Sequence, residues 1–159
     1  VCTHRDNLDQ NHIRETPLLV KLSPDLDETA LGNSIRVIKE FSIQGVIVAN
    51  TTVKRPELKS KHRFENGGLS GKPLQKRSTE MIRNVFQKLG TEMPIIGVGG
   101  IFSGADAYDK IRAGASAVQI YTGLIYEGPG QVRKVKRELA KLLNEDGFTS
   151  VSDAVGVDS

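Results

Sequence analysis

The sequence has 159 residues, of which 38% are hydrophobic, and a formal net charge of +3 at neutral pH. This length suffices for one domain with a hydrophobic core, and 16 glycines are typical of an α/β protein with many strand-to-helix turns. The single cysteine, Cys2, excludes an internal disulfide and a cysteine-based zinc site, and no apolar run approaches the ~18 residues of a membrane span. The chain begins at Val1 rather than at a methionine, so we expect it to be part of a longer protein.

Residues 1–16 are polar and have no strong period, which predicts the end of a helix followed by a loop. Residues 17–23, PLLVKLS, form an apolar run bounded by prolines, as in a buried parallel strand. Lys21 interrupts this strand. A lysine there needs either an electron-rich partner or a route to water for its ammonium, and the residues alone leave both interpretations open.

A helix is predicted next, capped by Asp25 or Asp27 and running to about Phe41. Its apolar face carries Leu31, Ile35 and Ile38.

The second predicted strand is residues 45–50, and it ends in three polar side chains, Asn50, Thr51 and Thr52. Such residues commonly form an Asx-type turn. In a barrel, polar residues at the carboxyl end of a strand are more typical of ligand contacts.

Residues 53–71 make an unusually long and charged connection, which is typical of a lid or a binding loop. It closes with GGLSGKP, and Pro73 suits the first turn of a helix that runs to about Leu89. We interpret Met81 and Phe86 of this helix as core residues.

The segment PIIGVGGIFSG, residues 94–104, predicts a short strand that breaks into glycines before a helix begins at Ser103. Glycines at a strand end leave backbone N–H groups uncovered, so a phosphate can approach them closely. A second strand, 117–120, ends in Tyr121-Thr122-Gly123. Two neighbouring strand ends of this kind commonly hold a phosphate in a (β/α)₈ barrel, although a tight turn alone would also explain the glycines.

Two further helices complete the pattern. The first spans 103–113, where Ser103 and Asp106 resemble a variant capping box and Gly114 marks the end. The second spans 129–144, and we expect its inward face to hold Val132, Val135, Leu139, Leu142 and Leu143. One more turn is predicted at 150–154.

The second helix also carries a cluster of basic residues, Arg133, Lys134, Lys136, Arg137 and Lys141. No nucleic-acid-binding module accompanies them. We therefore interpret them as a solvated helix face and expect no nucleic-acid partner.

Strand and helix alternate four times, which predicts an α/β fold with a parallel sheet. Four βα units are half of an eight-stranded barrel, so we expect residues 1–159 to form a partial barrel domain, with the last four units in 17–159. An open doubly wound sheet is the alternative. The glycine-rich loop follows the third strand rather than the first, which argues against the usual dinucleotide fingerprint.

Six motifs in this order resemble the C-terminal half of the dihydroorotate dehydrogenase family: LLVKLSPDL, GVIVANTT, GGLSGKPL, PIIGVGGIFSG, IRAGASAVQIYTGLIYEGP and VKRELAKLLNEDGF. GGLSGKPL and the last motif are similar to the class 2, quinone-dependent branch. The resemblance implies a TIM barrel that binds FMN, oxidises (S)-dihydroorotate to orotate in pyrimidine synthesis, and passes electrons to ubiquinone. It also implies a membrane location, either the mitochondrial inner membrane or a bacterial cytoplasmic membrane.

The resemblance further implies a role for particular residues. Lys21 would lie beside the flavin ring and stabilise its reduced form. Ala49 would contact FMN through its backbone, since this position often carries threonine in the family. Asn50 and Thr51 would hydrogen-bond dihydroorotate. The remaining expected FMN contacts are Ser70 and Gly71 on the flavin side and Gly99, Gly100, Tyr121 and Thr122 at the phosphate and ribityl chain.

The catalytic serine base of class 2 members would precede Val1, as would the helices of the quinone tunnel. The chain is therefore expected to hold no catalytic base and no metal, and to be inactive alone. Two alternatives stay open. One is another FMN- or phosphate-binding barrel enzyme, such as a lyase or isomerase, and the other is a non-catalytic fragment.

Overall fold

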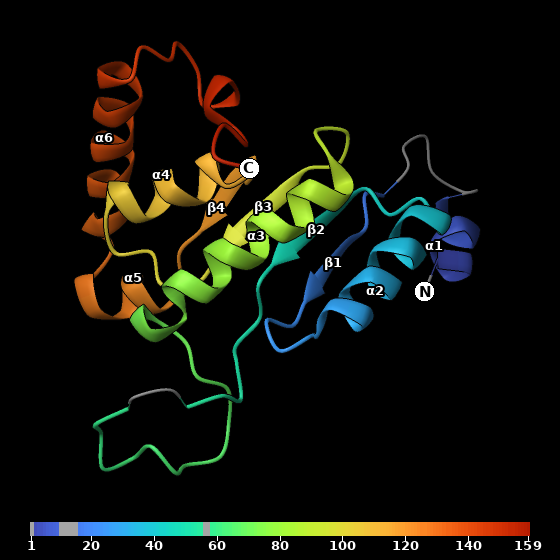
Figure 1. Cartoon of the computed structure of the whole chain (residues 1–159), viewed down its shortest axis with the longest axis horizontal. Helices are drawn as coiled ribbons and strands as arrows, with labels where there is room; N and C mark the ends of the chain where they lie inside the picture. The colour runs from blue at the N-terminus through green and yellow to red at the C-terminus, as the bar shows by residue number, and fades with distance from the viewer. Residues whose placement is uncertain (1, 10–15, 56–57) are drawn as a thin grey trace.

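A four-stranded parallel sheet forms the centre of the computed structural model, which describes residues 2–9, 16–55 and 58–159 (Figure 1). The strands lie in chain order, β1 (Leu19–Leu22), β2 (Gly45–Val48), β3 (Ile95–Val98) and β4 (Ala117–Gln119). The register aligns Lys21 with Ile47, Ile47 with Ile96, and Ile96 with Ala117. Because all the strands are parallel, their carboxyl ends meet at one edge of the sheet.

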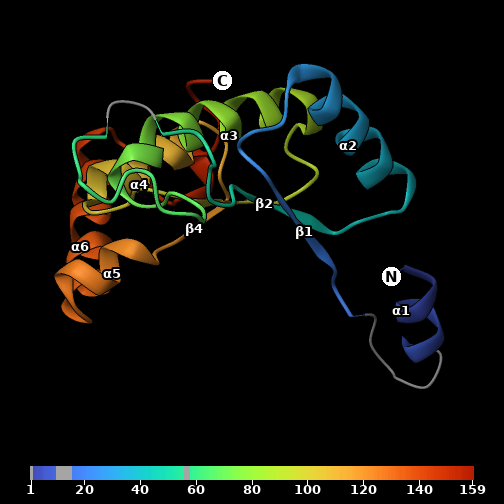
Figure 2. The ribbon, with the colours of Figure 1, turned by 90° about the horizontal axis from the view of Figure 1, so that it is seen from below.

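The helices that connect the strands lie along one face of the sheet, as Figure 2 shows for α2, α3 and α4. The helices and short 3₁₀ turns are α1 (Cys2–Asp9), α2 (Glu28–Glu40), η1 (Lys72–Leu74), α3 (Gln75–Leu89), α4 (Gly104–Arg112), α5 (Thr122–Glu127), α6 (Gly130–Glu145) and η2 (Ser152–Ala154). None of the described helices is long and apolar enough to cross a membrane.

The main hydrophobic core lies between the sheet and these helices. Val46, Val48 and Ile95 point from the strands toward the helices and are fully buried. The predicted apolar face of α2 is confirmed, since Leu31, Ile35 and Ile38 are buried. α3 contributes Met81, Ile82, Val85 and Leu89, while Phe86 packs partly buried against the same cluster.

No described helix covers the other face of the sheet in its middle (Figure 2). Lys21 of β1 and Gln119 of β4 are exposed there, and Ile47 is half-buried. The sequence predicted β1 as a buried strand, but only Leu22 of its four residues is fully buried because β1 lies at the edge of the sheet. All-parallel sheets normally have both faces covered, so the exposed face is the one a complete barrel would enclose.

Helix caps follow the predictions with two refinements. Asp27, rather than Asp25, caps α2 by accepting a hydrogen bond from the Ala30 backbone N–H at 2.7 Å. Ser103 caps α4, but the Asp106 carboxylate accepts from the Phe102 N–H at 2.8 Å instead of completing a capping box with Ser103.

The C-terminal part departs from the prediction at α5 and at Val132. α5 was not predicted, because its six residues are too few to show a helical period. Val132 is wrong as an inward residue, since it is 46% exposed on α6. The short turn after α6 is confirmed as η2. The helix end predicted near the N-terminus is α1, whereas residues 10–15 of the predicted loop lie outside the described residues.

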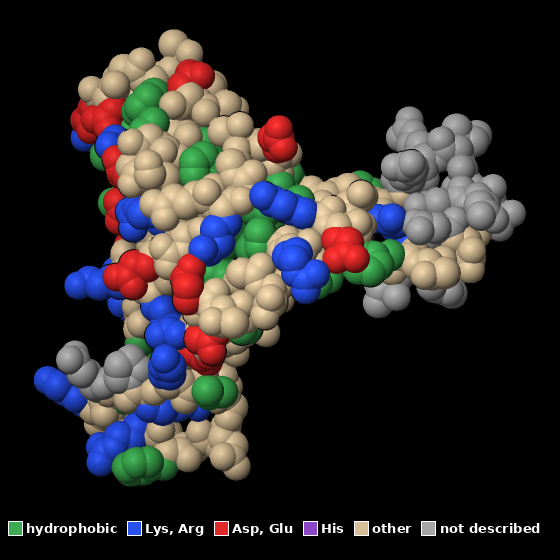
Figure 3. All heavy atoms as spheres, turned by 45° about the vertical axis from the view of Figure 1, so that its right-hand side comes forward, with side chains coloured by type: hydrophobic (Ala, Val, Ile, Leu, Met, Phe, Trp, Pro, Cys, Tyr) green, Lys and Arg blue, Asp and Glu red, His purple; other side chains and the backbone are tan. Residues whose placement is uncertain are grey.

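The long connection after β2 leaves the body of the protein and returns to it (Figure 1). Thr52 and Leu69 close its neck through two backbone hydrogen bonds, Thr52 N–H to Leu69 O at 3.1 Å and the reverse at 2.7 Å. Figure 3 shows this loop as a projection at the bottom of the molecule that bears several Lys and Arg side chains. Phe64 on the loop is 82% exposed.

Candidate functional site

The carboxyl ends of the four strands surround a pocket of about 80 Å³. All ten residues that the sequence assigned to a cofactor or a substrate line it. They are Lys21, Ala49, Asn50, Thr51, Ser70, Gly71, Gly99, Gly100, Tyr121 and Thr122. Leu74, Val98, Ile101, Gln119 and Gly123 complete the lining. The fold therefore brings together residues spread over a hundred positions of sequence, while their roles toward a ligand remain predictions.

Lys21 enters the pocket from β1, on the sheet face whose middle is covered by none of the described helices. Its neighbours on the strand, Val20 and Leu22, pack on the hydrophobic core, and alternation along a strand sends Lys21 the other way. Lys21 and Gly100 line the same pocket although they come from β1 and from the turn after β3. Because Lys21 is exposed at the pocket and is not buried in the sheet, its ammonium needs no ion-pair partner within the sheet.

The end of β2 carries the predicted substrate residues. The Asn50 backbone N–H donates to Leu22 O at 2.8 Å, and the Ala49 N–H donates to Val98 O at 3.1 Å, so both neighbouring strands hold this segment. The side-chain oxygen of Asn50 accepts from the Thr51 N–H at 3.0 Å. Asn50 therefore makes this local turn contact and also lines the pocket.

Asp25 holds the same segment through hydrogen bonds, although the sequence predicted it only as a possible helix cap. Its carboxylate accepts from the Thr52 hydroxyl at 2.6 Å and from the Val53 backbone N–H at 2.8 Å. Arg77 of α3 lies 3.4 Å away. Burial raises the pKa of Asp25, but these hydrogen bonds and the Arg77 charge outweigh it and hold the pKa below its ordinary value. The only signal in the sequence was an acidic residue shortly after a strand, separated from β1 by Ser23 and Pro24.

The glycines after β3 are required by their surroundings. Gly99 and Gly100 have φ angles of +121° and +71°, which residues other than glycine rarely adopt. A Cβ atom on Gly99 would lie 3.0 Å from the Ser78 hydroxyl, and one on Gly100 would lie 2.6 Å from the Cα of Gln75. The turn is therefore pressed against the start of α3, and its backbone forms the pocket wall.

The segment before α3 meets the end of β4 across the pocket. Thr122 Oγ1 donates a hydrogen bond to Ser70 Oγ at 2.9 Å. Gly71 has φ of +79°, and a Cβ there would come 3.0 Å from the Thr122 methyl group. The loop that begins after β2 is thus tied to Thr122, the first residue of α5 after β4, beside the pocket.

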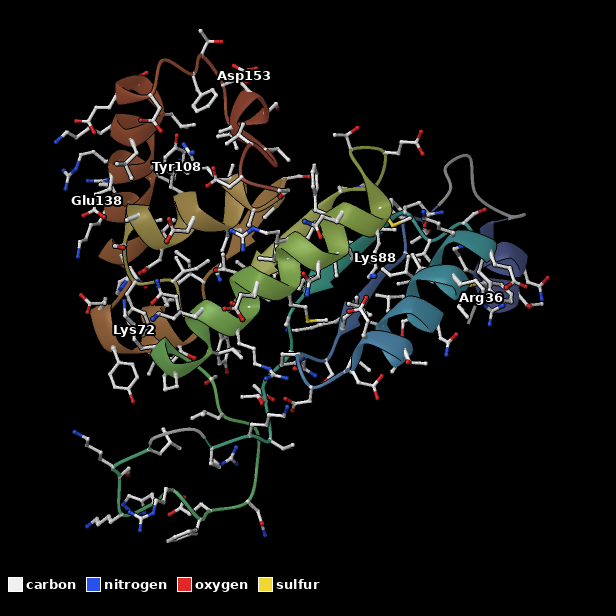
Figure 4. All side chains as sticks on the ribbon, viewed as in Figure 1. Arg36, Lys72, Lys88, Tyr108, Glu138 and Asp153 are labelled. Carbon is white, nitrogen blue, oxygen red and sulfur yellow. The ribbon has the colours of Figure 1, made fainter. Side chains whose placement is uncertain are left out.

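A second hollow of about 570 Å³ adjoins this contact and was not predicted. Lys72, Phe102 and Tyr126 line it together with residues 68–71 and Thr122. The Lys72 ammonium lies 5.9 Å from the centre of the Phe102 ring, and the Phe102 and Tyr126 rings are 6.5 Å apart. Figure 4 shows Lys72 where the loop meets α3, next to α5. Tyr121 itself is 75% exposed.

The described residues hold no group of three or more His, Cys, Asp or Glu side chains that could bind a metal ion. The polar groups at the pocket are instead an ammonium, an amide, hydroxyls and glycine backbone. Such a set suits an anionic or amide-rich organic ligand.

The parallel sheet, with helices on one face and a pocket at the carboxyl ends of the strands, defines this protein as part of a (β/α)₈ barrel. A family model described as Dihydroorotate dehydrogenase matches residues 5–143, and the chain belongs to this family. The expected fold class is thereby confirmed over the doubly wound alternative.

Relatives and solved structures agree with this assignment. A dihydroorotate dehydrogenase (quinone) of Xanthobacter autotrophicus is 54% identical over 90% of this chain and 40% of that protein. One of Trichodesmium erythraeum is 48% identical over 94% of this chain and 42% of that protein. The crystal structure of DHODH from Eimeria tenella in complex with ferulenol superposes with a TM-score of 0.92 at 39% identity, covering 98% of this chain and 45% of that chain. A ligand-free structure from the same organism gives a TM-score of 0.86 at 46% identity, covering 89% and 40%. The chain therefore spans less than half the length of these relatives.

Proposed function

We propose that this chain is the C-terminal half of a quinone-dependent dihydroorotate dehydrogenase and supplies one side of its flavin and substrate site. The observation that carries the proposal is the convergence of Lys21, Asn50, Gly100 and Thr122, from four different strand ends, on one pocket. Relatives that are about half identical over most of the chain are dihydroorotate dehydrogenases (quinone), which supports the same conclusion.

The residues of the pocket fit FMN. Gly99 and Gly100 line the pocket with backbone atoms, since a Cβ on them would meet Ser78 or Gln75, and Tyr121 and Thr122 add hydroxyl groups beside them. This set would hold the phosphate and the ribityl chain. Lys21 would place a positive charge next to the flavin ring, with Ala49, Ser70 and Gly71 as further contacts. When bound, FMN would supply the hydride acceptor for dihydroorotate and would pass the electrons on to quinone.

Asn50 and Thr51 would orient dihydroorotate in this proposal. An amide and a hydroxyl can match the carboxylate and ring amides of the substrate, which need partners once buried. Asp25 fixes the backbone that carries both residues through Thr52 and Val53.

The proton acceptor is assigned to a serine in the part of the protein that this chain does not include, and the quinone site to the same part. Dihydroorotate, orotate and ubiquinone are then the partners of the complete protein. Because ubiquinone is dissolved in lipid, the complete protein would work at a membrane, either the mitochondrial inner membrane or a bacterial cytoplasmic membrane.

The visible spectrum of the complete protein tests this proposal. We expect a yellow protein whose flavin absorbance bleaches when dihydroorotate is added without oxygen and returns when a soluble quinone follows. A colourless protein that binds sugar phosphates would favour another phosphate-binding barrel. A colourless chain that aggregates unless a partner is present would favour a non-catalytic fragment.

A further inference from the structure

A lysine is completely buried behind the glycine turn. Lys110 of α4 has 0% of its surface exposed, and its ammonium lies between α4 and the start of α3. It donates to the Ser78 hydroxyl at 2.5 Å, to the Thr79 hydroxyl at 2.9 Å and to the Gln75 backbone oxygen at 3.3 Å. All three acceptors are neutral, so the charge is hydrogen-bonded but not neutralised by them.

The acids near Lys110 do not form a hydrogen-bonded ion pair with it among the described residues. Asp106 and Asp109, on the same helix, act on it through space. The Asp106 carboxylate instead accepts from the Phe102 N–H at 2.8 Å and from the Gln75 side chain, and it lies 3.5 Å from the Lys72 ammonium. Burial lowers the pKa of Lys110 to about 8, with Asp106 and Asp109 opposing the change, so the ammonium is mostly charged at pH 7.

Burying such a charge weakens the fold, because an apolar side chain of similar length would avoid the loss of hydration. A functional role would explain why the charge is buried despite this cost. The hydrogen bonds of Lys110 connect it, through Ser78, to the turn that lines the pocket. The Ser78 hydroxyl, which accepts from Lys110, lies 3.1 Å from the Gly99 carbonyl oxygen and 3.0 Å from the Gln75 carbonyl oxygen. Because the Gln75 oxygen already accepts from Lys110, the single Ser78 proton is available to the Gly99 oxygen. The Gly99 carbonyl therefore points toward α3. The other side of the turn faces the pocket, which Gly99 and Gly100 line.

We infer that Lys110 is a positioning residue for the phosphate group of the flavin, acting through Ser78 on the Gly99–Gly100 turn and by its positive charge behind that turn. The inference rests on the proposed function, because it takes the ligand of this turn to be FMN. It predicts that Lys110 contributes to binding the phosphate and not to binding the rest of the flavin.

Comparison of FMN with riboflavin, which lacks the phosphate, isolates this contribution. The complete protein is freed of flavin, and both ligands are titrated at pH 7 by quenching of flavin fluorescence. We expect Lys110→Met to weaken FMN binding about tenfold, as for a buried charge that acts on an anion from the next layer of residues, with riboflavin binding changed less than about twofold. The thermal unfolding temperature of the flavin-free variant should stay equal or rise. Lys134→Met, on the exposed face of α6, is the matched control and should change neither ligand.

Ser78→Ala keeps the charge and removes the link to Gly99, so a smaller but still FMN-selective loss is expected. Equal binding of FMN by Lys110→Met and the parent protein, or an equal loss of FMN and riboflavin, would overturn the inference. If Lys110→Met does not fold, Ser78→Ala decides, and unchanged FMN binding there rejects the inference. A parent protein that binds neither flavin contradicts the proposed function itself, which separates the two failures.

Discussion

The Thr52 hydroxyl donates to Asp25 Oδ1 at 2.6 Å, so the residue after the predicted substrate pair is anchored to the loop that follows the neighbouring strand. This contact joins the carboxyl ends of β1 and β2 at the place where the pocket needs both. It places Asp25 among the residues that shape the site, although it does not line the pocket.

Replacing Asp25 with Asn should therefore loosen Asn50 and Thr51. The oxygen of an asparagine can still accept from the Val53 N–H, but its NH2 group can only donate to the Thr52 hydroxyl, and it carries no charge for Arg77, so the support of this segment is weakened. We expect KM for dihydroorotate to rise about tenfold, with FMN affinity nearly unchanged. Asp27→Asn is the matched control, since asparagine caps a helix as well as aspartate does. A variant with normal KM would show that Asp25 is only structural.

Asn50→Ala should weaken orotate and dihydroorotate more than FMN. A lost hydrogen bond to a buried ligand group corresponds to about tenfold in affinity. Titration of both ligands into the same preparation checks the difference, and Asn84→Ala on the exposed side of α3 serves as the control. Equal losses for substrate and flavin would show that Asn50 holds the pocket as a whole.

Lys21→Ala should slow flavin reduction by dihydroorotate about 10²- to 10³-fold, because one preorganised charge at the reacting group is removed. Stopped-flow absorbance of the bound flavin measures this step directly. Lys136→Ala, which is exposed on α6, should leave the rate unchanged. Normal reduction kinetics in Lys21→Ala would contradict its assigned place beside the ring.

Gly100→Ala and Gly90→Ala form a natural pair, since both glycines have φ of +71°. No atom lies within 4 Å of a Cβ on Gly90, whereas one on Gly100 would lie 2.8 Å from the Gln75 backbone nitrogen. The change at Gly90 should cost about 1–3 kcal/mol in unfolding free energy from backbone strain alone, because its φ of +71° with ψ of −158° is a conformation that essentially only glycine adopts. Gly100→Ala should cost more and also weaken FMN. Equal losses of stability in urea titrations would exclude the steric contact.

Stability should rise with pH between about 8 and 10 because of Lys110. Its pKa is lowered to about 8 in the folded protein from 10.5, so in this range the unfolded chain binds more protons than the folded one. Raising the pH then favours the folded state, by roughly 2–3 kcal/mol over the window. Above pH 10.0 the raised pKa of buried Tyr108 acts in the opposite direction.

Urea unfolding at several pH values measures this dependence, and Lys110→Met is the informative comparison. Its stability should lack the rise, because a methionine does not titrate. The same rise in parent and variant would assign it to other groups.

The sequence by itself determined the alternation of strands and helices and the polar strand ends. These are local properties: apolar runs, a capping Asp27, and glycines where the chain turns. It also allowed Lys21, Asn50 and Gly100 to be grouped, because parallel strands must end at the same edge of a sheet. Their resemblance to a known family supplied the ligands to expect.

Only the tertiary structure decided which groups support that edge. Asp25 and Lys110 show no local pattern that separates them from ordinary cap and surface residues, since their partners are distant in sequence. Lys110 finds Ser78 32 positions away, and Asp25 finds Thr52 27 positions away. The burial of a charged side chain depends on which helices pack around it, and that depends on contacts that no single stretch of sequence contains.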